Sequence, residues 1–109
     1  MSDDAPLGTF EEQVMVAVVR TGADAYGMAV RREIGEVLGR DVTIGAVYAT
    51  LDRLEAKGLV ASTRTPGEAS RRVFAVTTRG ARALAASREM RERLWQGVDL
   101  AGFLPEGAG

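Results

Sequence analysis

The sequence predicts a mostly α-helical fold with one small antiparallel β-hairpin, and three observations support this prediction. Apolar residues recur every three or four positions, the spacing of a helix, on both sides of residues 59–77. Within that stretch, two short runs rich in β-branched and apolar residues flank Pro66-Gly67, a dipeptide that suits a tight turn. The chain has 109 residues, which is the size of one domain with a modest core.

Two helices are predicted before this stretch. The first covers about residues 10–19, with capping-box spacing in Thr9-Phe10-Glu11-Glu12 and an end before Gly22. Every residue from 14 to 19 is apolar. A helix that is apolar all round favours a partner subunit, although a slightly over-hydrophobic core helix would show the same pattern. A turn over residues 22–26 leads to a second helix that ends at Gly39 and carries Met28, Val30, Ile34, Val37 and Leu38.

A third helix and the hairpin follow. Thr43 suits the N-cap, Gly58 lies just past the end, and the core stripe consists of Ile44, Val47, Leu51 and Leu54. Strands are expected over 59–64 and 71–77, with a wing near 65–70 between them. Two helices with a short connection, followed by such a hairpin, predict a winged helix-turn-helix, in which the second helix of the pair enters the major groove of DNA.

The last predicted helix begins at Thr77 or Thr78 and runs to about Leu100. At about 30 Å for some twenty residues it is longer than the core requires, so its far end predicts a contact with a twofold-related copy. The sequence thus divides into a winged-helix domain over 7–80, a dimerisation helix over 78–100 and a flexible tail over 101–109.

Composition argues against several classes of protein. The chain has neither cysteine nor histidine, which removes disulfides, thiolate zinc sites and the commonest general base. The sequence also contains no paired-carboxylate motif and no phosphate-cradling glycine motif, so we expect neither an enzyme nor a metal or cofactor. No apolar run approaches a membrane span, and residues 1–8 are acidic rather than signal-like, which predicts a cytoplasmic protein.

Charge is distributed unevenly along the chain. Residues 1–52 hold four basic and nine acidic side chains, a balance of −5, whereas residues 53–93 hold ten basic and four acidic ones, a balance of +6. The positive section coincides with the end of the third helix, the wing and most of the last helix, which favours nucleic acid as a partner. A solvated basic face, or a winged-helix module that binds protein instead of DNA, remains the alternative.

Three blocks of the sequence, AYGMAVRREI, GAVYATLDRLEAKGLV and SRRVFAVTTRG, resemble the PadR family of winged-helix transcriptional regulators. The resemblance covers about residues 7–98, and the middle block fits the family pattern G-x-x-Y-x-x-L-x-R-L-E-x-x-G-L. Val73 stands beside Phe74 where the family usually has two aromatic residues. A single helix after the wing is similar to the short subgroup, whose members dimerise through that helix. The resemblance implies a homodimer on a double-stranded DNA operator, usually a repressor.

The residues expected to meet DNA lie on the third helix, on the face opposite its core stripe, and on the hairpin. Small side chains at Ala46 and Ala49 permit close approach to base edges, while hydroxyl and guanidinium groups supply hydrogen bonds. Tyr48 has an alternative as a core aromatic, and Arg53 could instead pair with a nearby carboxylate, Asp52 or Glu55. The full set is Thr43, Gly45, Ala46, Tyr48, Ala49, Thr50, Arg53, Lys57, Arg64, Arg71 and Arg72.

A second candidate site surrounds Trp95 on the last helix. In the short subgroup that the chain resembles, a tryptophan on this helix can line a pocket between subunits and stack on a small aromatic effector. Packing of the dimer alone would use the same large apolar surface. The residues expected in this dimer interface or ligand pocket are Phe10, Val14, Met15, Met90, Leu94, Trp95 and Val98.

Overall fold

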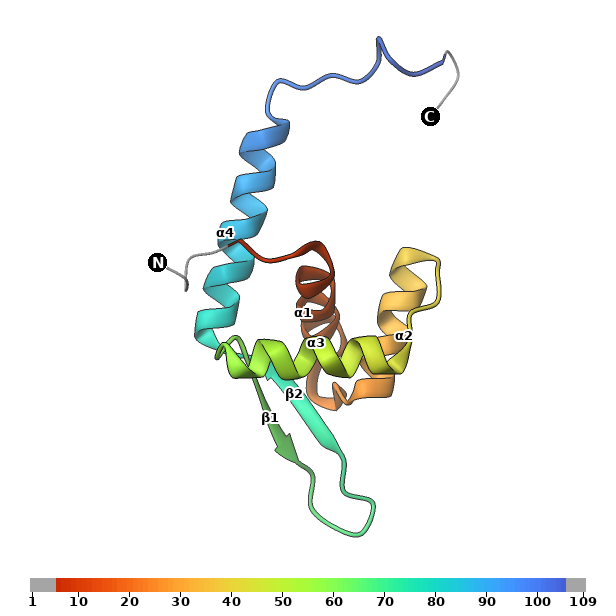
Figure 1. Ribbon diagram of the computed structural model, residues 1–109, viewed down its shortest axis with the longest axis vertical. Coiled ribbons are helices and arrows are strands. Elements are labelled where there is room, and N and C mark those ends of the chain that lie inside the picture. The colour runs from red at the N-terminus through yellow and green to blue at the C-terminus, as the bar shows by residue number, and fades with distance from the viewer. Residues whose placement is uncertain (1–5, 106–109) are drawn as a thin grey trace.

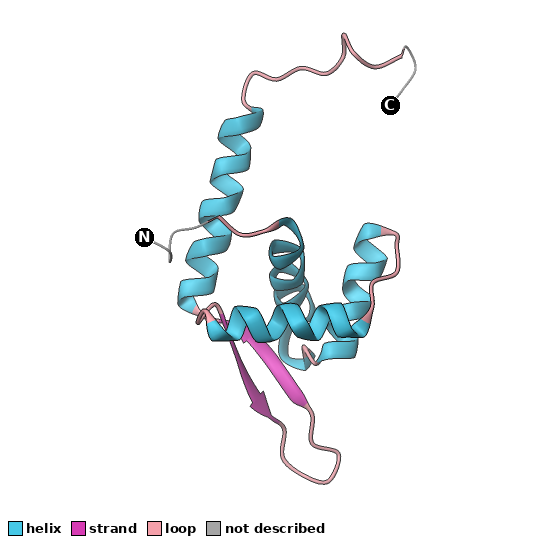
Figure 2. Cartoon of the chain, viewed as in Figure 1, coloured by secondary structure: helices cyan, strands magenta, loops and turns pink. Residues whose placement is uncertain are grey.

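The computed structural model describes residues 6–105 of the chain (Figure 1). Three helices form the main body, a two-stranded hairpin projects from it, and a final helix leaves the body on the side opposite the hairpin tip. Figure 2 shows the same arrangement by element type, and the mostly helical fold with one hairpin confirms the predicted fold class. In chain order the elements are α1 (Thr9–Thr21), the 3-10 turn η2 (Gly22–Asp24), α2 (Gly27–Leu38), α3 (Ile44–Ala56), β1 (Val60–Arg64), β2 (Arg72–Val76) and α4 (Thr78–Trp95).

The hydrophobic core lies where α1, α2 and α3 meet the base of the hairpin. Met15, Leu51 and Leu54 are its largest fully buried side chains, and Phe74 closes it from β2. The stripe predicted on the third helix is therefore mostly buried as expected, with Val47 also fully enclosed. Burial of apolar surface at roughly 25 cal/mol per Å² is the main term that holds these elements together.

Helix ends follow local side-chain chemistry, with one correction at the first helix. Thr43 caps α3 as predicted, its hydroxyl accepting from the Ala46 N–H at 3.1 Å. The capping box predicted from Thr9 and Glu12 is wrong by one residue. Gly8 is the N-cap of α1, and the Glu11 carboxylate accepts from the Gly8 N–H at 2.9 Å. This shift leaves Glu12 free to pair elsewhere.

The hairpin matches its predicted strands to within a residue. β1 and β2 are antiparallel, with Val60 opposite Val76 and Arg64 opposite Arg72. Gly67 has a φ of 99°, the positive value that the turn was expected to need. The segment just before α2 also pairs with β2. The Phe74 N–H donates to the Ala25 carbonyl at 2.8 Å, and Tyr26 forms an antiparallel bridge with Val73. This pairing attaches the hairpin to the helical body through β2.

The last helix is anchored at its base and ends earlier than predicted. A Cβ at Gly80 would come within 2.0 Å of the Leu59 carbonyl oxygen, so only glycine permits this close contact between α4 and the start of the hairpin. The prediction of a helix to about Leu100 is wrong: α4 ends at Trp95, because Gln96 is extended and Gly97 has a φ of 77°. The molecule is nevertheless elongated, at 58 × 35 × 21 Å.

The predicted tail over 101–109 lies only partly within the described residues, which end at 105. There the Phe103 N–H donates to the Leu100 carbonyl at 2.9 Å and forms a turn. The flexibility of the tail stays a prediction.

Candidate nucleic-acid interface

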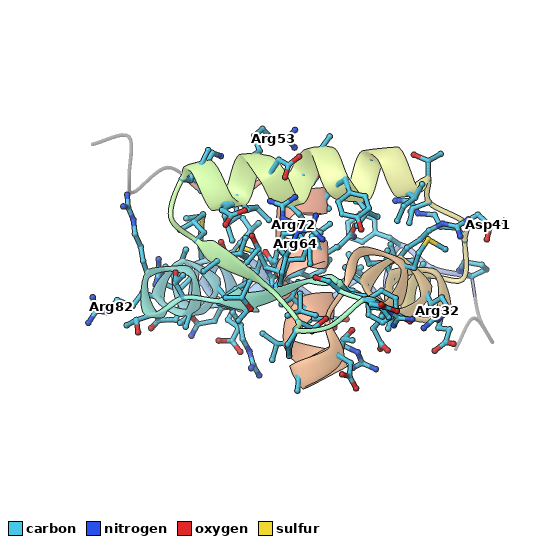
Figure 3. The ribbon with its side chains drawn as sticks, turned by 90° about the horizontal axis from the view of Figure 1, so that it is seen from below. Arg32, Asp41, Arg53, Arg64, Arg72 and Arg82 are labelled. Carbon is cyan, nitrogen blue, oxygen red and sulfur yellow. The ribbon has the colours of Figure 1, made fainter. Side chains whose placement is uncertain are left out.

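The solvent face of α3 carries most of the residues predicted to meet bases. Gly45, Ala46, Ala49, Arg53 and Lys57 are all exposed, and Figure 3 shows Arg53 pointing away from the body. Because the first three have no bulk, the backbone of α3 can approach a groove floor closely, with two cations toward the C-terminal end of the helix. The predicted face is thus exposed as a unit, although DNA contact by these residues stays a prediction.

Two polar residues of α3 do not belong to this face in the way that was predicted. Thr50 is buried, with only 2% of its surface exposed, and its hydroxyl accepts from Arg53 Nη2 at 3.3 Å. The assignment of Thr50 as a DNA contact is therefore wrong, because this residue lies on the side of α3 that faces the core. The Thr43 side chain is exposed, but its hydroxyl already caps the helix.

Tyr48 is half-buried between α2 and the hairpin. Its ring lies so close to Gly27 that a Cβ there would come within 2.3 Å of the ring, and its centroid is 6.5 Å from that of Phe74. These contacts favour the alternative of a core aromatic. The hydroxyl edge borders a hollow between the wing and α2, so a role at the DNA surface stays a prediction.

Arg72 is the centre of a polar network that joins the hairpin to α3. Its guanidinium donates to Glu55 Oε1 at 2.6 Å and to Ser62 Oγ at 3.1 Å, and it pairs with Asp52 at 2.9 Å. The guanidinium also lies 4.7 Å from the centre of the Phe74 ring. Arg72 was predicted to meet DNA. In the structure, the guanidinium of Arg72 instead binds three acceptors of the same chain.

Glu55 completes the same network from the helix side. Its carboxylate accepts from both the backbone N–H and the hydroxyl of Ser62, at 3.1 Å and 2.8 Å. Hydrogen bonds from Ser62, and then from Arg72, hold the pKa of Glu55 below its usual value of 4.5. A carboxylate that stays ionised here fixes the angle between the wing and α3.

The cations of α3 pair with a carboxylate that would compete with DNA phosphate. This carboxylate is Glu11, and not Asp52 or Glu55 as expected from the sequence. Lys57 Nζ lies 2.8 Å from Glu11 Oε2, and Arg53 Nε lies 3.8 Å from the same oxygen. Burial alone would raise the pKa of Glu11, but the hydrogen bonds from Lys57 and from the Gly8 N–H outweigh it and leave that pKa lowered. Arg53 and Lys57 are both more than half exposed, and pairs of this kind exchange readily for phosphate.

A cationic cluster lies at the start of α2, and no local pattern in the sequence indicates it. The Arg71 guanidinium lies 4.1 Å from the centre of the Tyr26 ring, and Arg32 donates to the Tyr26 hydroxyl at 3.2 Å. That hydrogen bond, together with the nearby charges, lowers the pKa of Tyr26. The cluster borders a hollow of about 560 Å³ that Arg64 and Arg72 also line. The pairing of Tyr26 with Val73 and the hydrogen bond from the Phe74 N–H to the Ala25 carbonyl bring these elements together, and no local sequence signal predicts either contact.

The second candidate site divides into two parts. Met90, Leu94, Trp95 and Val98 are exposed, and 72% of the Leu94 surface is open to solvent. Val14 and Met15 are fully buried in the core of the single chain, so their assignment to a dimer or ligand surface is wrong. The all-apolar run of α1 places these two inward, and Val16 and Val19 are the members that remain exposed. Phe10 is partly buried and packs against the core.

Among residues 6–105, no helix is long and apolar enough to cross a membrane. The same residues contain no group of three or more acidic side chains placed to hold a metal ion.

Comparisons with known proteins agree with this geometry. The model of the transcriptional regulator PadR-like family matches residues 15–86. RosR from H. salinarum is 27% identical over 85% of this chain and 80% of its own, with a TM-score of 0.68. A PadR family transcriptional regulator from Eggerthella lenta is 28% identical over 78% of this chain and 76% of its own, with a TM-score of 0.65. A search among curated proteins finds no significant match.

Proposed function

This chain belongs to the PadR-like family of transcriptional regulators, and we propose that it acts as a homodimeric repressor on a pseudo-palindromic operator in double-stranded DNA. Members of this class are generally not enzymes. Two copies would place their α3 helices in successive major grooves, about one helical turn apart. Bound there, the dimer would block transcription in the cytoplasm.

The observation that carries this proposal is the exposed face of α3 beside a wing held at a fixed angle. Small residues at Gly45, Ala46 and Ala49 leave the helix free to approach base edges, while Arg53 and Lys57 supply charge. The Arg72 and Glu55 network keeps the hairpin in place next to that helix. A helix and a wing held in this way can enter adjacent grooves without first paying for ordering of the wing.

The cluster at the start of α2 supports contacts to the DNA backbone. Arg71 and Arg32 both contact Tyr26, which is the N-cap of α2. Backbone N–H groups at the start of a helix favour an anion, and two guanidinium groups add to that field. We assign to this cluster a phosphate of the strand that passes between α2 and the wing.

The distal half of α4 supports the dimer. Its apolar side chains at Leu94 and Trp95 are mostly exposed in one chain, and a second copy would remove that surface from water. An aromatic effector is not part of the proposed function. More than half of the Trp95 surface is exposed in one chain, so the walls of such a site would have to come from the partner.

The test is binding of the purified protein to the promoter upstream of its own gene, measured by mobility shift at several salt concentrations. We expect Arg53→Ala and Arg71→Ala each to weaken specific binding about tenfold, the effect of losing one charge-assisted contact. Each should also lower the slope of log affinity against log salt by about one unit per subunit.

Arg82→Ala is the matched control, because this arginine is also exposed but lies on α4, away from α3 and the wing (Figure 3). Unchanged affinity and salt slope in both test variants would remove the assignment of the DNA surface. Failure of the wild-type protein to bind any promoter specifically would favour the alternative of a winged-helix module that binds protein.

A further inference from the structure

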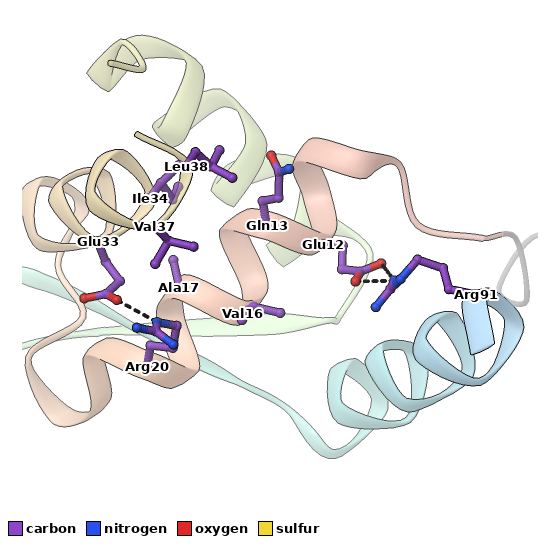
Figure 4. A pocket seen from close by; sticks show the side chains of 10 residues that line it. All are labelled: Glu12, Gln13, Val16, Ala17, Arg20, Glu33, Ile34, Val37, Leu38 and Arg91. Atoms are coloured by element: carbon purple, nitrogen blue, oxygen red, sulfur yellow. Dashed lines mark hydrogen bonds and ion pairs between the residues drawn. The ribbon is translucent and has the colours of Figure 1, made fainter. Parts of the chain in front are cut away.

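A shallow groove between α1 and α2 is lined by none of the residues assigned above to the DNA surface. Its floor is apolar and consists of Val16, Ala17, Ile34, Val37 and Leu38 (Figure 4). Ion pairs stand at its two ends, one between Arg20 and Glu33 and one between Glu12 and Arg91 of α4. The volume is about 290 Å³, enough for a few side chains but at the lower limit for a drug-sized ligand.

The chain after α4 carries apolar side chains of its own that are left in solvent. Leu100, Phe103 and Leu104 are all exposed, and 85% of the Phe103 surface is open. Asp99 is the single charged residue between 96 and 104. A segment with this composition matches this groove, because its three apolar side chains can cover the apolar floor. The rim is neutral, since Arg20 pairs with Glu33 and Arg91 with Glu12, so the single carboxylate of Asp99 meets no net negative charge there.

We propose that the α1–α2 groove of each subunit receives residues 98–104 of a second copy of this chain. This inference rests on the homodimer proposed above, and the groove and the segment are the surfaces that would stabilise that dimer. Seven extended residues reach about 23 Å, whereas the groove follows α1 from Glu12 to Arg20, about 12 Å, so the segment is long enough to fill it.

The occupant is the partner's segment rather than the chain's own. In the single chain, residues 96–105 leave the end of α4 and do not line the groove (Figure 1). Docking within one chain would also leave Leu94 and Trp95 of α4 exposed. Exchange between two copies covers the α4 tip and both grooves in one interface, which is continuous from α4 to α1 and α2.

The absence of cysteine from the chain permits a direct test by engineered cross-linking. Val37→Cys, in the groove, and Phe103→Cys, in the tail, are made in separate preparations, one of which carries a size tag. The two proteins are mixed, left to exchange subunits, oxidised without DNA and separated on a non-reducing gel. We expect the main cross-linked product to contain one tagged and one untagged chain. Ala69→Cys, exposed in the wing, replaces Val37→Cys in the control and should give no such product.

A second measurement does not depend on disulfide geometry. Phe103→Asp should raise the dissociation constant of the dimer at least tenfold in analytical ultracentrifugation, whereas Ala69→Asp, exposed in the wing and outside the proposed interface, should change it less than twofold. An internal disulfide in the double variant Val37→Cys/Phe103→Cys, without a dimer, would overturn the proposal. So would the absence of any cross-link together with an unchanged dissociation constant for Phe103→Asp.

These outcomes are separable from failure of the proposed function. A cross-linked dimer that binds no promoter would contradict DNA binding but leave the groove assignment standing. Specific DNA binding, with neither a cross-link nor a change in the dissociation constant of Phe103→Asp, would do the reverse.

Discussion

The base of the wing and the distal half of α4 differ in how far a single chain satisfies their chemistry. At the base of the wing, Arg72 donates to Glu55 and Ser62, Ser62 donates to Glu55, and Phe74 is buried beneath them. Among residues 6–105 no buried side-chain nitrogen or oxygen lacks a hydrogen-bond partner. Along α4, by contrast, the side chains after Ser87 are all exposed to the end of the helix.

This difference shows which part of the fold is complete in one copy. The α3–wing unit is a finished structure, because a buried or half-buried charge is stable only when its partners are in place. The α4 tip has an apolar surface that costs free energy until something covers it. Stability of the wing should therefore be a property of the monomer, and coverage of α4 a property of the assembly.

Gly80 lies where the first turn of α4 packs against the start of the hairpin, and its replacement should cause the largest loss of stability. In Gly80→Ala the new methyl group would meet the Leu59 carbonyl oxygen at 2.0 Å and Val76 Cγ1 at 2.9 Å. Since backbone must move, we expect a loss of about 3 kcal/mol in the free energy of unfolding, measured by denaturant titration at fixed protein concentration.

Gly45→Ala is the control for Gly80→Ala. A Cβ at Gly45 meets nothing within 4 Å, and its φ is not positive. Alanine there should stabilise α3 by at most about 1 kcal/mol. Equal effects of the two substitutions would show that α4 is not anchored through this contact.

Removal of Arg72 should separate a positioning role from a DNA contact. Arg72→Ala leaves Glu55 and Asp52 without their cation, so we expect a loss of about 1–2 kcal/mol in stability. Operator affinity should fall because the wing is less well held, but the salt slope should stay that of the wild type. Arg71→Ala, one residue away, should lower the slope and leave stability nearly unchanged. If Arg72→Ala lowered the slope of log affinity against log salt, Arg72 would contact DNA directly and its purely positioning role would be contradicted.

The sequence predicted the fold more fully than the site. Helical spacing, Thr43 and the positive φ of Gly67 are local properties, and local patterns place elements to within a few residues. The end of α4 was missed because apolar spacing continues past Gly97, where the backbone no longer follows a helix.

The errors at the site concern residues whose partners are distant in sequence. Arg72 and Thr50 are residue types that often contact DNA, but Thr50 is buried, and Arg72, which is half-buried, donates to Glu55, 17 positions away. Glu11 meets Lys57 across 46 positions, and Arg71 meets Tyr26 only because the hairpin folds back on α2. Pairings of this kind depend on tertiary packing, which the spacing of residues along the chain does not specify.

The pH dependence of stability should report on the wing network. The folded pKa of Glu55 lies below its usual value of 4.5, first because of Ser62 and then because of Arg72. The ionised carboxylate therefore stabilises the fold above about pH 4.5, and this contribution disappears as the pH falls through the lower, folded value. Glu55→Gln should be less stable than the wild type at pH 7, and the difference in unfolding free energy should shrink below pH 4.5. A difference that is constant with pH would contradict this role.

The smallest expected effect concerns Glu11, which holds two cations of α3 in the absence of DNA. In Glu11→Gln, Lys57 and Arg53 lose their competing carboxylate, while the amide oxygen can still accept from the Gly8 N–H. Exposed pairs are worth about 0–1 kcal/mol, so operator binding should tighten by roughly two- to fivefold at low salt and return to the wild-type value at high salt. Glu33→Gln, which releases Arg20 between α1 and α2 instead, should leave affinity unchanged. Equal tightening in both variants would mean that net charge, and not the release of Lys57, controls binding, and the α3 cations would then lose their specific role.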